Sequence, residues 1–171
     1  MLKQSPNDPK QYQAITLANG LRVLLIHNDE TSKSAAALAV NVGHFNDPKD
    51  RQGLAHFLEH MLFLGTKNFP DGSEYQKFIN QHGGNHNAWT GTEHTCFFFD
   101  IQAAHFTPAL QRFSEFFIAP LLADEFVIKE RENIDAEFTL KLKDDMRRLY
   151  DVHKDTVNPE HPFSQFSVGN L

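Results

Sequence analysis

The sequence predicts an α+β fold, in which a mostly antiparallel mixed sheet has helices packed on one face. Two observations predict it: short apolar runs separated by turn signals, and longer stretches in which apolar residues recur at the helical period. The two kinds of segment alternate along the chain, and the tight hairpins favour antiparallel pairing. With 171 residues, of which 40% are hydrophobic, we expect residues 1–171 to form a single domain with its own core.

The expected strands are short apolar runs bounded by turn residues. The stretch AITLANGLRVLLIH predicts two strands around Asn19-Gly20, a strong hairpin signal. A third strand is predicted over residues 34–42, and the stretches NHNAWT and HTCFFFDIQ predict two more that join near Gly91. The single cysteine, Cys96, lies in the last of these. We interpret it as a packed thiol, because one cysteine can form neither an internal disulfide nor a cysteine-based zinc site.

The first three predicted helices follow from apolar content and capping residues. The stretch GLAHFLEHMLFLGT, residues 53–66, is too long and too apolar for a surface strand. A short helix follows it, with Ser73 as its cap and Gly83 at its end. The stretch TPALQRFSEFFIAP predicts a third, with Thr107 as its cap and Pro108 at its first position.

A longer helix is predicted from about Ala123 to Val152, because apolar residues recur along it near the helical period. Two stretches are expected to be loops. One is NPEHPFSQFSVGNL, after this helix, and the other is HFNDPKDRQ, in which Asp47-Pro48 marks a break.

Composition argues against several classes of partner. The net charge is −6 and no run of Lys or Arg stands out, so a nucleic-acid partner is not expected. No stretch of about 18 apolar residues is present, so we expect no membrane span. The first residues lack the apolar core of a signal peptide. We therefore expect a cytoplasmic protein, or a periplasmic one if a leader was removed.

The first predicted helix carries two histidines and a glutamate within an apolar sequence. His56 and His60 are four residues apart, so their imidazoles project from one face of a helix, and Glu59 lies at the edge of that face. Burying three polar side chains without partners would cost roughly 1–3 kcal/mol each. A bound cation removes that cost. Two imidazoles suit zinc, and a nearby carboxylate that is not a ligand can accept a proton from metal-bound water.

This pattern is H-x-x-E-H, the inverse of the H-E-x-x-H zinc motif. By itself it is also compatible with a core helix whose histidines are hydrogen-bonded to protein groups. A catalytic zinc site needs a third protein ligand, and the long helix offers Glu130 and Glu137, seven residues apart and on one face. Glu132 points elsewhere, and we expect it to be solvated. Spacing does not decide which of the other two binds a metal, and an ordinary charged helix face is the alternative.

Several separated blocks, in order, resemble the pitrilysin and insulin-degrading enzyme family of zinc metallopeptidases. They are GLAHFLEHMLFLGT, FPDGSEYQKFINQHGGNHNAWTGTEHTCFFFDI, FFIAPLLADEFVIKERENIDAEF and NPEHPFSQFSVGN. The resemblance implies one Zn²⁺ per chain bound by His56, His60 and Glu137. It implies that Glu59 is the general base and that Glu130 is a carboxylate just outside the coordination sphere. The implied activity is hydrolysis of peptide bonds in peptides and unfolded segments.

The resemblance also implies where a substrate would lie. Asn87, Ala88, Trp89 and Thr90 match an edge strand to which an extended peptide adds through main-chain hydrogen bonds. Phe63 and Trp89 match positions that line the pocket after the scissile bond, with plain core aromatics as the alternative. Three further histidines could suggest a second metal cluster: His82, His86 and His94. We interpret them as structural or solvated, because Gly83-Gly84 interrupts any helical spacing between His82 and His86.

The chain departs from the resembled family in length. Members of that branch have four related domains in two halves, and 171 residues are fewer than one such domain. We therefore expect a truncated N-terminal, zinc-bearing part that is inactive or weakly active alone. Its partners would be peptide substrates, the remaining domains of a longer peptidase chain and, for the fragment, a second copy. The rival interpretation is a non-catalytic structural subunit or assembly half with the same fold.

Overall fold

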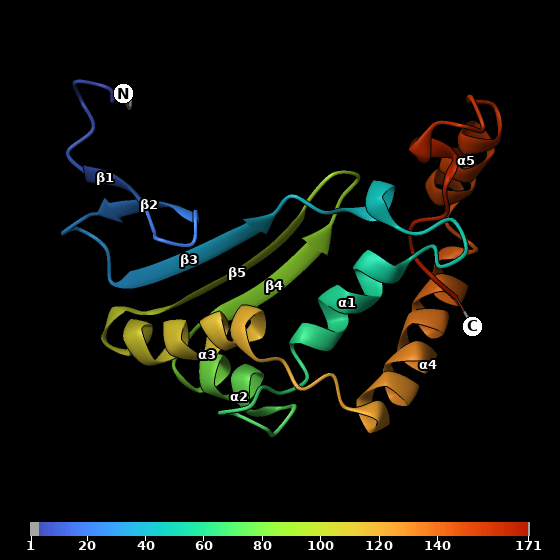
Figure 1. Ribbon diagram of the computed structural model, residues 1–171. Coiled ribbons are helices and arrows are strands. Elements are labelled where there is room, and N and C mark those ends of the chain that lie inside the picture. Colours follow the sequence, from blue (N-terminus) through green and yellow to red (C-terminus); the bar gives the residue numbers. More distant parts are fainter. Residues whose placement is uncertain (1–3, 171) are drawn as a thin grey trace. The chain divides into compact units, whose positions relative to one another are not determined.

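The computed structural model describes residues 4–170, which divide into two compact units with the boundary between Lys33 and Ser34. The first unit contains an antiparallel hairpin of β1 (Gln11–Thr16) and β2 (Arg22–His27), coloured blue in Figure 1. Gly20 lies in its turn with φ of 86°, a left-handed conformation that glycine adopts without strain. The predicted hairpin is confirmed.

The second unit contains a three-stranded sheet in the order β3-β5-β4. Its strands are β3 (Lys33–Val40), β4 (Asn85–Thr90) and β5 (Thr95–Gln102), and β4 and β5 are antiparallel, with Trp89 opposite Cys96. Side chains along β5 alternate between buried and more exposed, as in a sheet with one covered face. The predicted α+β class is therefore confirmed, although the strands form two sheets and not one.

Three helices lie in the same unit: α1 (Leu54–Leu62), α2 (Glu74–Gln81) and α3 (Phe106–Ile118). In Figure 1, α2 and α3 lie on the same side of the sheet, and α1 lies beside β4. The core forms where these helices meet β5. Its buried members are mostly aromatic and aliphatic: Leu62, Tyr75, Ile79, Phe97, Phe99, Ile101, Ala109, Phe113 and Phe116.

The long helix predicted from Ala123 to Val152 is two helices, α4 (Asp124–Lys141) and α5 (Asp145–Asp155). Asp144 has extended backbone angles, and its side chain accepts hydrogen bonds from the N–H groups of Met146 and Arg147. This is N-cap geometry, which starts a new helix. The apolar period alone did not reveal the break. α4 packs against α1 (Figure 1).

Three helix ends also differ from expectation. α1 stops at Leu62, before the end of the apolar stretch. Ser73 does precede α2, but its hydroxyl donates to Asp71 and does not cap the helix. α3 begins at Phe106, so Thr107 and Pro108 lie inside its first turn, where proline is tolerated. Gly83 follows the end of α2 with φ of 67°, as predicted.

Among residues 4–170, every helix is too short or too polar to cross a membrane.

Candidate metal centre

The start of α1 is fixed by a buried carboxylate. Asp47 Oδ2 accepts from the N–H of Gly53, and its Oδ1 accepts from the N–H of Ala55, both at 2.8 Å. These N–H groups belong to the first turn, which has no partners within the helix. Asp47 thereby sets the direction in which α1 leaves the loop. From the sequence, Asp47 was expected only to mark a break in a loop, together with Pro48.

α1 places its two histidines side by side, as their spacing predicts. The ring centroids of His56 and His60 are 4.6 Å apart, and their Nε2 atoms are 3.2 Å apart. Glu137 reaches the same point from α4, with its Oε2 3.8 Å from each Nε2. Zinc bonds of about 2.0–2.2 Å place tetrahedral ligand atoms roughly 3.3–3.6 Å apart. The triangle of three atoms is therefore close to the size that a zinc ion requires.

The other ring nitrogen of each histidine is bound to a protein acceptor. His56 Nδ1 lies 2.7 Å from the carbonyl oxygen of Val168, and His60 Nδ1 lies 2.8 Å from Glu130 Oε1. Carbonyl and carboxylate oxygens accept hydrogen bonds, so these partners assign the proton of each neutral ring to Nδ1. Glu130 is itself held by the side-chain amide of Asn133. Both Nε2 atoms are then unprotonated and face the Glu137 carboxylate.

Three acceptor atoms thus converge with no donor between them. Lone pairs that face one another at these distances are unfavourable, and a cation at their centre removes the conflict. Two imidazole nitrogens and one carboxylate oxygen are a donor set of catalytic zinc sites, which keep a fourth position open. Within residues 4–170, this is the one group of three or more candidate ligands with atoms within 4.8 Å of one another. The residues therefore fit a zinc ion.

The second carboxylate oxygen of Glu137 has a different partner. Lys141, one turn later on α4, donates to Oε1. Burial by itself would raise the pKa of Glu137, but the hydrogen bond from Lys141 and the positive charge of its ammonium group help to lower that pKa overall. The carboxylate is therefore held ionised, with Oε2 directed to the histidines. Lys141 was not among the predicted site residues, although its spacing from Glu137 is that of a common helix ion pair.

Glu59 lies beside this group and outside it. Its side chain is 8% exposed, and Oε2 accepts a hydrogen bond from the Thr90 hydroxyl at the end of β4. The Thr95 hydroxyl on β5 lies 3.5 Å from that of Thr90 and donates to the Val42 carbonyl. A carboxylate with one oxygen anchored to an edge strand can exchange protons at the other. No motif or spacing in the sequence predicts the contact between Glu59 and Thr90.

The predicted substrate strand lies at the edge of its sheet. In the order β3-β5-β4, β4 pairs with β5 on one side only. Its side chains alternate, so that Asn87 and Trp89 are exposed while Ala88 and Thr90 are half-buried. The unpaired side of such a strand offers main-chain groups to an added peptide. Its end at Thr90 lies next to Glu59.

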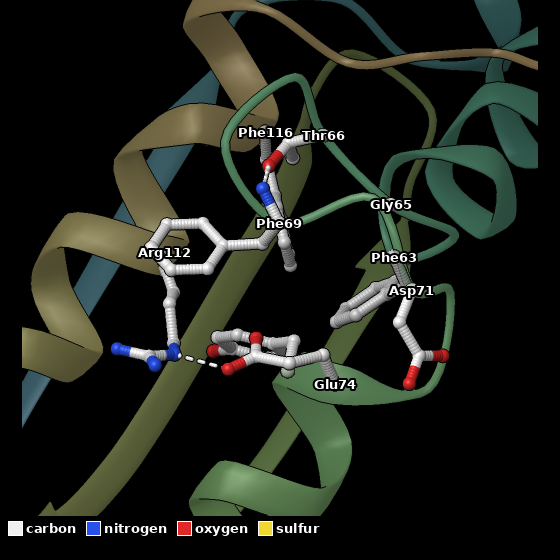
Figure 2. A pocket seen from close by; sticks show the side chains of 9 residues that line it. Phe63, Gly65, Thr66, Phe69, Asp71, Glu74, Arg112 and Phe116 are labelled. Atoms are coloured by element: carbon white, nitrogen blue, oxygen red, sulfur yellow. Dashed lines mark hydrogen bonds and ion pairs between the residues drawn. The ribbon is translucent and has the colours of Figure 1, made fainter.

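The two predicted pocket residues lie in different environments. Phe63 packs against the core, with ring centroids 5.1 Å from Phe116 and 6.1 Å from Phe97. It lines the small pocket of Figure 2, where Arg112 binds Glu74 across the opening. That pocket has room for about one water molecule and not for a substrate side chain.

Trp89 is not among the residues that line this pocket. It is 45% exposed and packs edge-on against His94. The remaining histidines set aside in the sequence analysis pack on aromatic rings: His82 on Phe78, and His86 near Phe63.

One contact of the metal centre had no signal in the sequence. The Val168 carbonyl that binds His56 is a main-chain group, so no residue type marks it, and it comes from the stretch expected to be a plain loop. Within that stretch, only Pro162–Ser164 forms a short 3-10 helix.

Comparisons with known proteins were made for the whole chain. A family model described as Insulinase (Peptidase family M16) matches residues 22–161. The chain is 44% identical over 169 residues to the insulin-degrading enzyme of Homo sapiens, covering 99% of this chain and 17% of that protein. It is 39% identical over 170 residues to protease 3 of Salmonella typhimurium, covering 99% of this chain and 18% of that protein.

A solved structure agrees with these relatives. The crystal structure of pitrilysin matches with a TM-score of 0.94 and 40% sequence identity, over 99% of this chain and 18% of that one. The chain therefore spans less than a fifth of the length of these relatives.

Proposed function

The chain belongs to the insulinase family of peptidases, family M16, and from that premise we propose that it is the zinc-bearing part of an endopeptidase. The observation that carries the proposal is the convergence of His56 Nε2, His60 Nε2 and Glu137 Oε2 with no donor between them. These three atoms would hold the metal. Glu130 and Val168 would orient the two imidazoles from behind.

When bound, a zinc ion in such a site polarises the peptide carbonyl and lowers the pKa of a water molecule. We assign Glu59 the proton transfers. The Thr90 hydroxyl donates to Oε2, so Oε1 would take the proton of the attacking water and deliver it to the leaving amine. The low exposure of Glu59 keeps bulk water from competing for that proton.

For the substrate, we propose a peptide in extended conformation, added to the free edge of β4. Main-chain pairing along Asn87, Ala88, Trp89 and Thr90 would bring the scissile bond toward Glu59, because Thr90 is the last residue of β4 and its hydroxyl donates to that carboxylate. Main-chain recognition accepts many sequences. The name of one relative, insulin-degrading enzyme, refers to a polypeptide substrate, which supports this class.

As partners, we propose the remaining domains of a longer peptidase chain. Support comes from the share of the relatives that is matched and from exposed apolar side chains on the second unit. Met146, Leu149 and Val152 are each at least 60% exposed and three residues apart on α5, so they share one face. Such a face is covered in a complete protein or, in the isolated chain, favours association with a second copy.

The rival proposal, a structural subunit without chemistry, is not favoured by any observation at the metal centre. Two measurements separate them. Elemental analysis should find one zinc per wild-type chain and much less in His60→Ala. In the complete peptidase, Glu59→Gln should retain zinc but lose about 10²–10⁴-fold in turnover of a quenched peptide. Absence of zinc from the wild type, or full turnover by Glu59→Gln, would reject the proposal.

A further inference from the structure

The segment 165–169 lies against the start of α1. Besides the bond from His56 to the Val168 carbonyl, the N–H of Phe166 donates to Gln52 Oε1 at 2.7 Å. A Cβ added to Gly53 would lie 2.6 Å from the Cα of Gly169, so the two backbones touch. These contacts hold the segment 165–169 against the N-terminal end of α1, the helix that carries both histidines.

A buried lysine from α5 fixes the same segment from the other side. Lys154 is 5% exposed, and its ammonium donates to the Gln165 carbonyl at 2.7 Å and to the Ser167 hydroxyl at 3.3 Å. It also lies over the Tyr150 ring, 4.9 Å from the centroid. A buried ammonium is costly unless it is well hydrogen-bonded. Here its bonds are made to residues one and three positions before Val168.

We propose that Lys154 is a positioning residue of the metal centre, which holds the Val168 carbonyl on His56 and thereby keeps His56 Nε2 free for the metal. This inference rests on the proposed function. The path has three steps: Lys154 binds Gln165 and Ser167, the segment presents the Val168 carbonyl, and that carbonyl accepts a hydrogen bond from the Nδ1–H of His56. Without a fixed acceptor at Nδ1, the imidazole can rotate or move its proton to Nε2, which blocks the ligand atom.

A purely structural role for Lys154 makes a different prediction. In that case its loss would lower the stability of the α5 region and leave the protonation pattern of His56 unchanged in the folded protein. The discriminating observable is therefore the tautomer of the His56 ring in the zinc-free protein, read from the ¹⁵N shifts of its ring nitrogens.

The test compares Lys154→Met, which keeps most of the apolar stem, with Lys154→Arg and with Lys143→Met at an exposed position. Loss of the partner behind a metal-bound histidine weakens binding by about 10–100-fold, so Lys154→Met should lose about 10-fold in zinc affinity, measured by chelator competition. Its zinc-free His56 ring should show the Nε2–H form. Lys154→Arg should restore much of the affinity, and Lys143→Met should match the wild type.

A folded Lys154→Met with wild-type zinc affinity and an unchanged His56 tautomer would overturn the inference. If that variant does not fold, Lys154→Gln decides, because its amide keeps a polar group at this buried position but is too short to reach both Gln165 and Ser167. It should weaken zinc binding several-fold, and unchanged affinity would overturn the inference. Should the wild type bind no zinc, the proposed function fails, but the tautomer comparison in zinc-free protein still decides the role of Lys154.

Discussion

At the scale of single residues, each proposed ligand of the candidate metal centre divides its polar atoms between two tasks. The two histidines give Nδ1 to a protein acceptor and Nε2 to the centre, and Glu137 gives Oε1 to Lys141 and Oε2 to the centre. Each of these side chains therefore has a hydrogen-bond partner on the atom that does not face the centre. In zinc sites, such partners fix the orientation of the ligand and raise its basicity. The two glutamates of α4 differ in this respect, since Glu130 binds His60 and Glu137 faces both rings.

We expect the two glutamates to respond differently to the same substitution. Glu130→Gln should weaken zinc binding by about 10-fold, at the lower end of the effect of losing an outer partner, because the amide oxygen can still accept from His60. Glu137→Gln should weaken it by considerably more, because a charged ligand is lost. Competition titration with a chelator measures both, and Glu132→Gln on the exposed face of α4 is the control. The reverse order of effects would exchange the two roles.

The members of the candidate metal centre were predictable from the sequence to different degrees. The pairing of His56 with His60 follows from a spacing of four on a helix, and the structure places them together. The choice between Glu130 and Glu137 did not follow from spacing, since both lie on one face. The Val168 carbonyl could not be found at all, because main-chain groups are the same at every residue and only the path of the loop brings this one to His56.

At the scale of elements, the helices are positioned by their ends more than by their apolar faces. The prediction of one continuous helix from Ala123 to Val152 was wrong. Leu142 and Leu149 continue the helical period, but their side chains are 53% and 62% exposed, so they do not mark a buried face of one helix. Asp144 ends the pattern by capping α5. The hairpin was predicted correctly because its signal, Asn19-Gly20, is local chemistry of the turn itself.

Asp47 gives a test at this scale. We expect Asp47→Ala to lower the free energy of unfolding by about 1–2 kcal/mol, because the first turn of α1 loses its cap and the Gly53 N–H is left without its partner. Urea denaturation of the zinc-free chain measures the change. Asp50→Ala, at an exposed position in the same loop, should stay within about 0.5 kcal/mol of the wild type. Equal stability of the two variants would contradict the capping role.

At the scale of the whole molecule, buried histidines should make the fold sensitive to acid. Burial is the main cause that lowers the pKa of His44, helped by the charge of Lys154, and burial lowers the pKa of His86. A neutral His44 donates from Nδ1 to the Gly91 carbonyl, while its Nε2 is buried without a hydrogen-bond partner. The unfolded chain therefore binds more protons than the folded one below about pH 6.5, the ordinary value for histidine.

It follows that the free energy of unfolding is highest above about pH 6.5 and falls as the pH is lowered through the folded-state pKa values. Each such histidine contributes a slope of at most about 1.4 kcal/mol per pH unit. We expect His44→Gln to reduce the loss of stability between about pH 7.5 and 5.5, measured by urea denaturation with a chelator present. His27→Gln, at an exposed strand end, should leave the loss unchanged. An unaltered slope in His44→Gln would show that His44 does not titrate on unfolding.

The last prediction concerns what these residues can do alone. Peptide hydrolysis needs the scissile carbonyl within about 3–3.5 Å of the attacking water, and the free edge of β4 would contact the proposed extended peptide along one side only. The relatives are several times longer, since this chain spans 17% of the human insulin-degrading enzyme and 18% of pitrilysin. We therefore expect much of the substrate-holding surface to come from the rest of a longer peptidase.

The 171-residue chain should accordingly bind zinc but cleave a quenched peptide far more slowly than the complete peptidase. Peptide binding through the main chain of β4 should be measurable separately from cleavage. A zinc-loaded chain with Glu59→Gln should bind an extended peptide weakly, and the same peptide with N-methylated amides should bind less well, because methylation removes the donors that strand addition uses. Turnover near 10 s⁻¹, a median value for enzymes, would show that the chain alone holds its substrate well enough for the reaction.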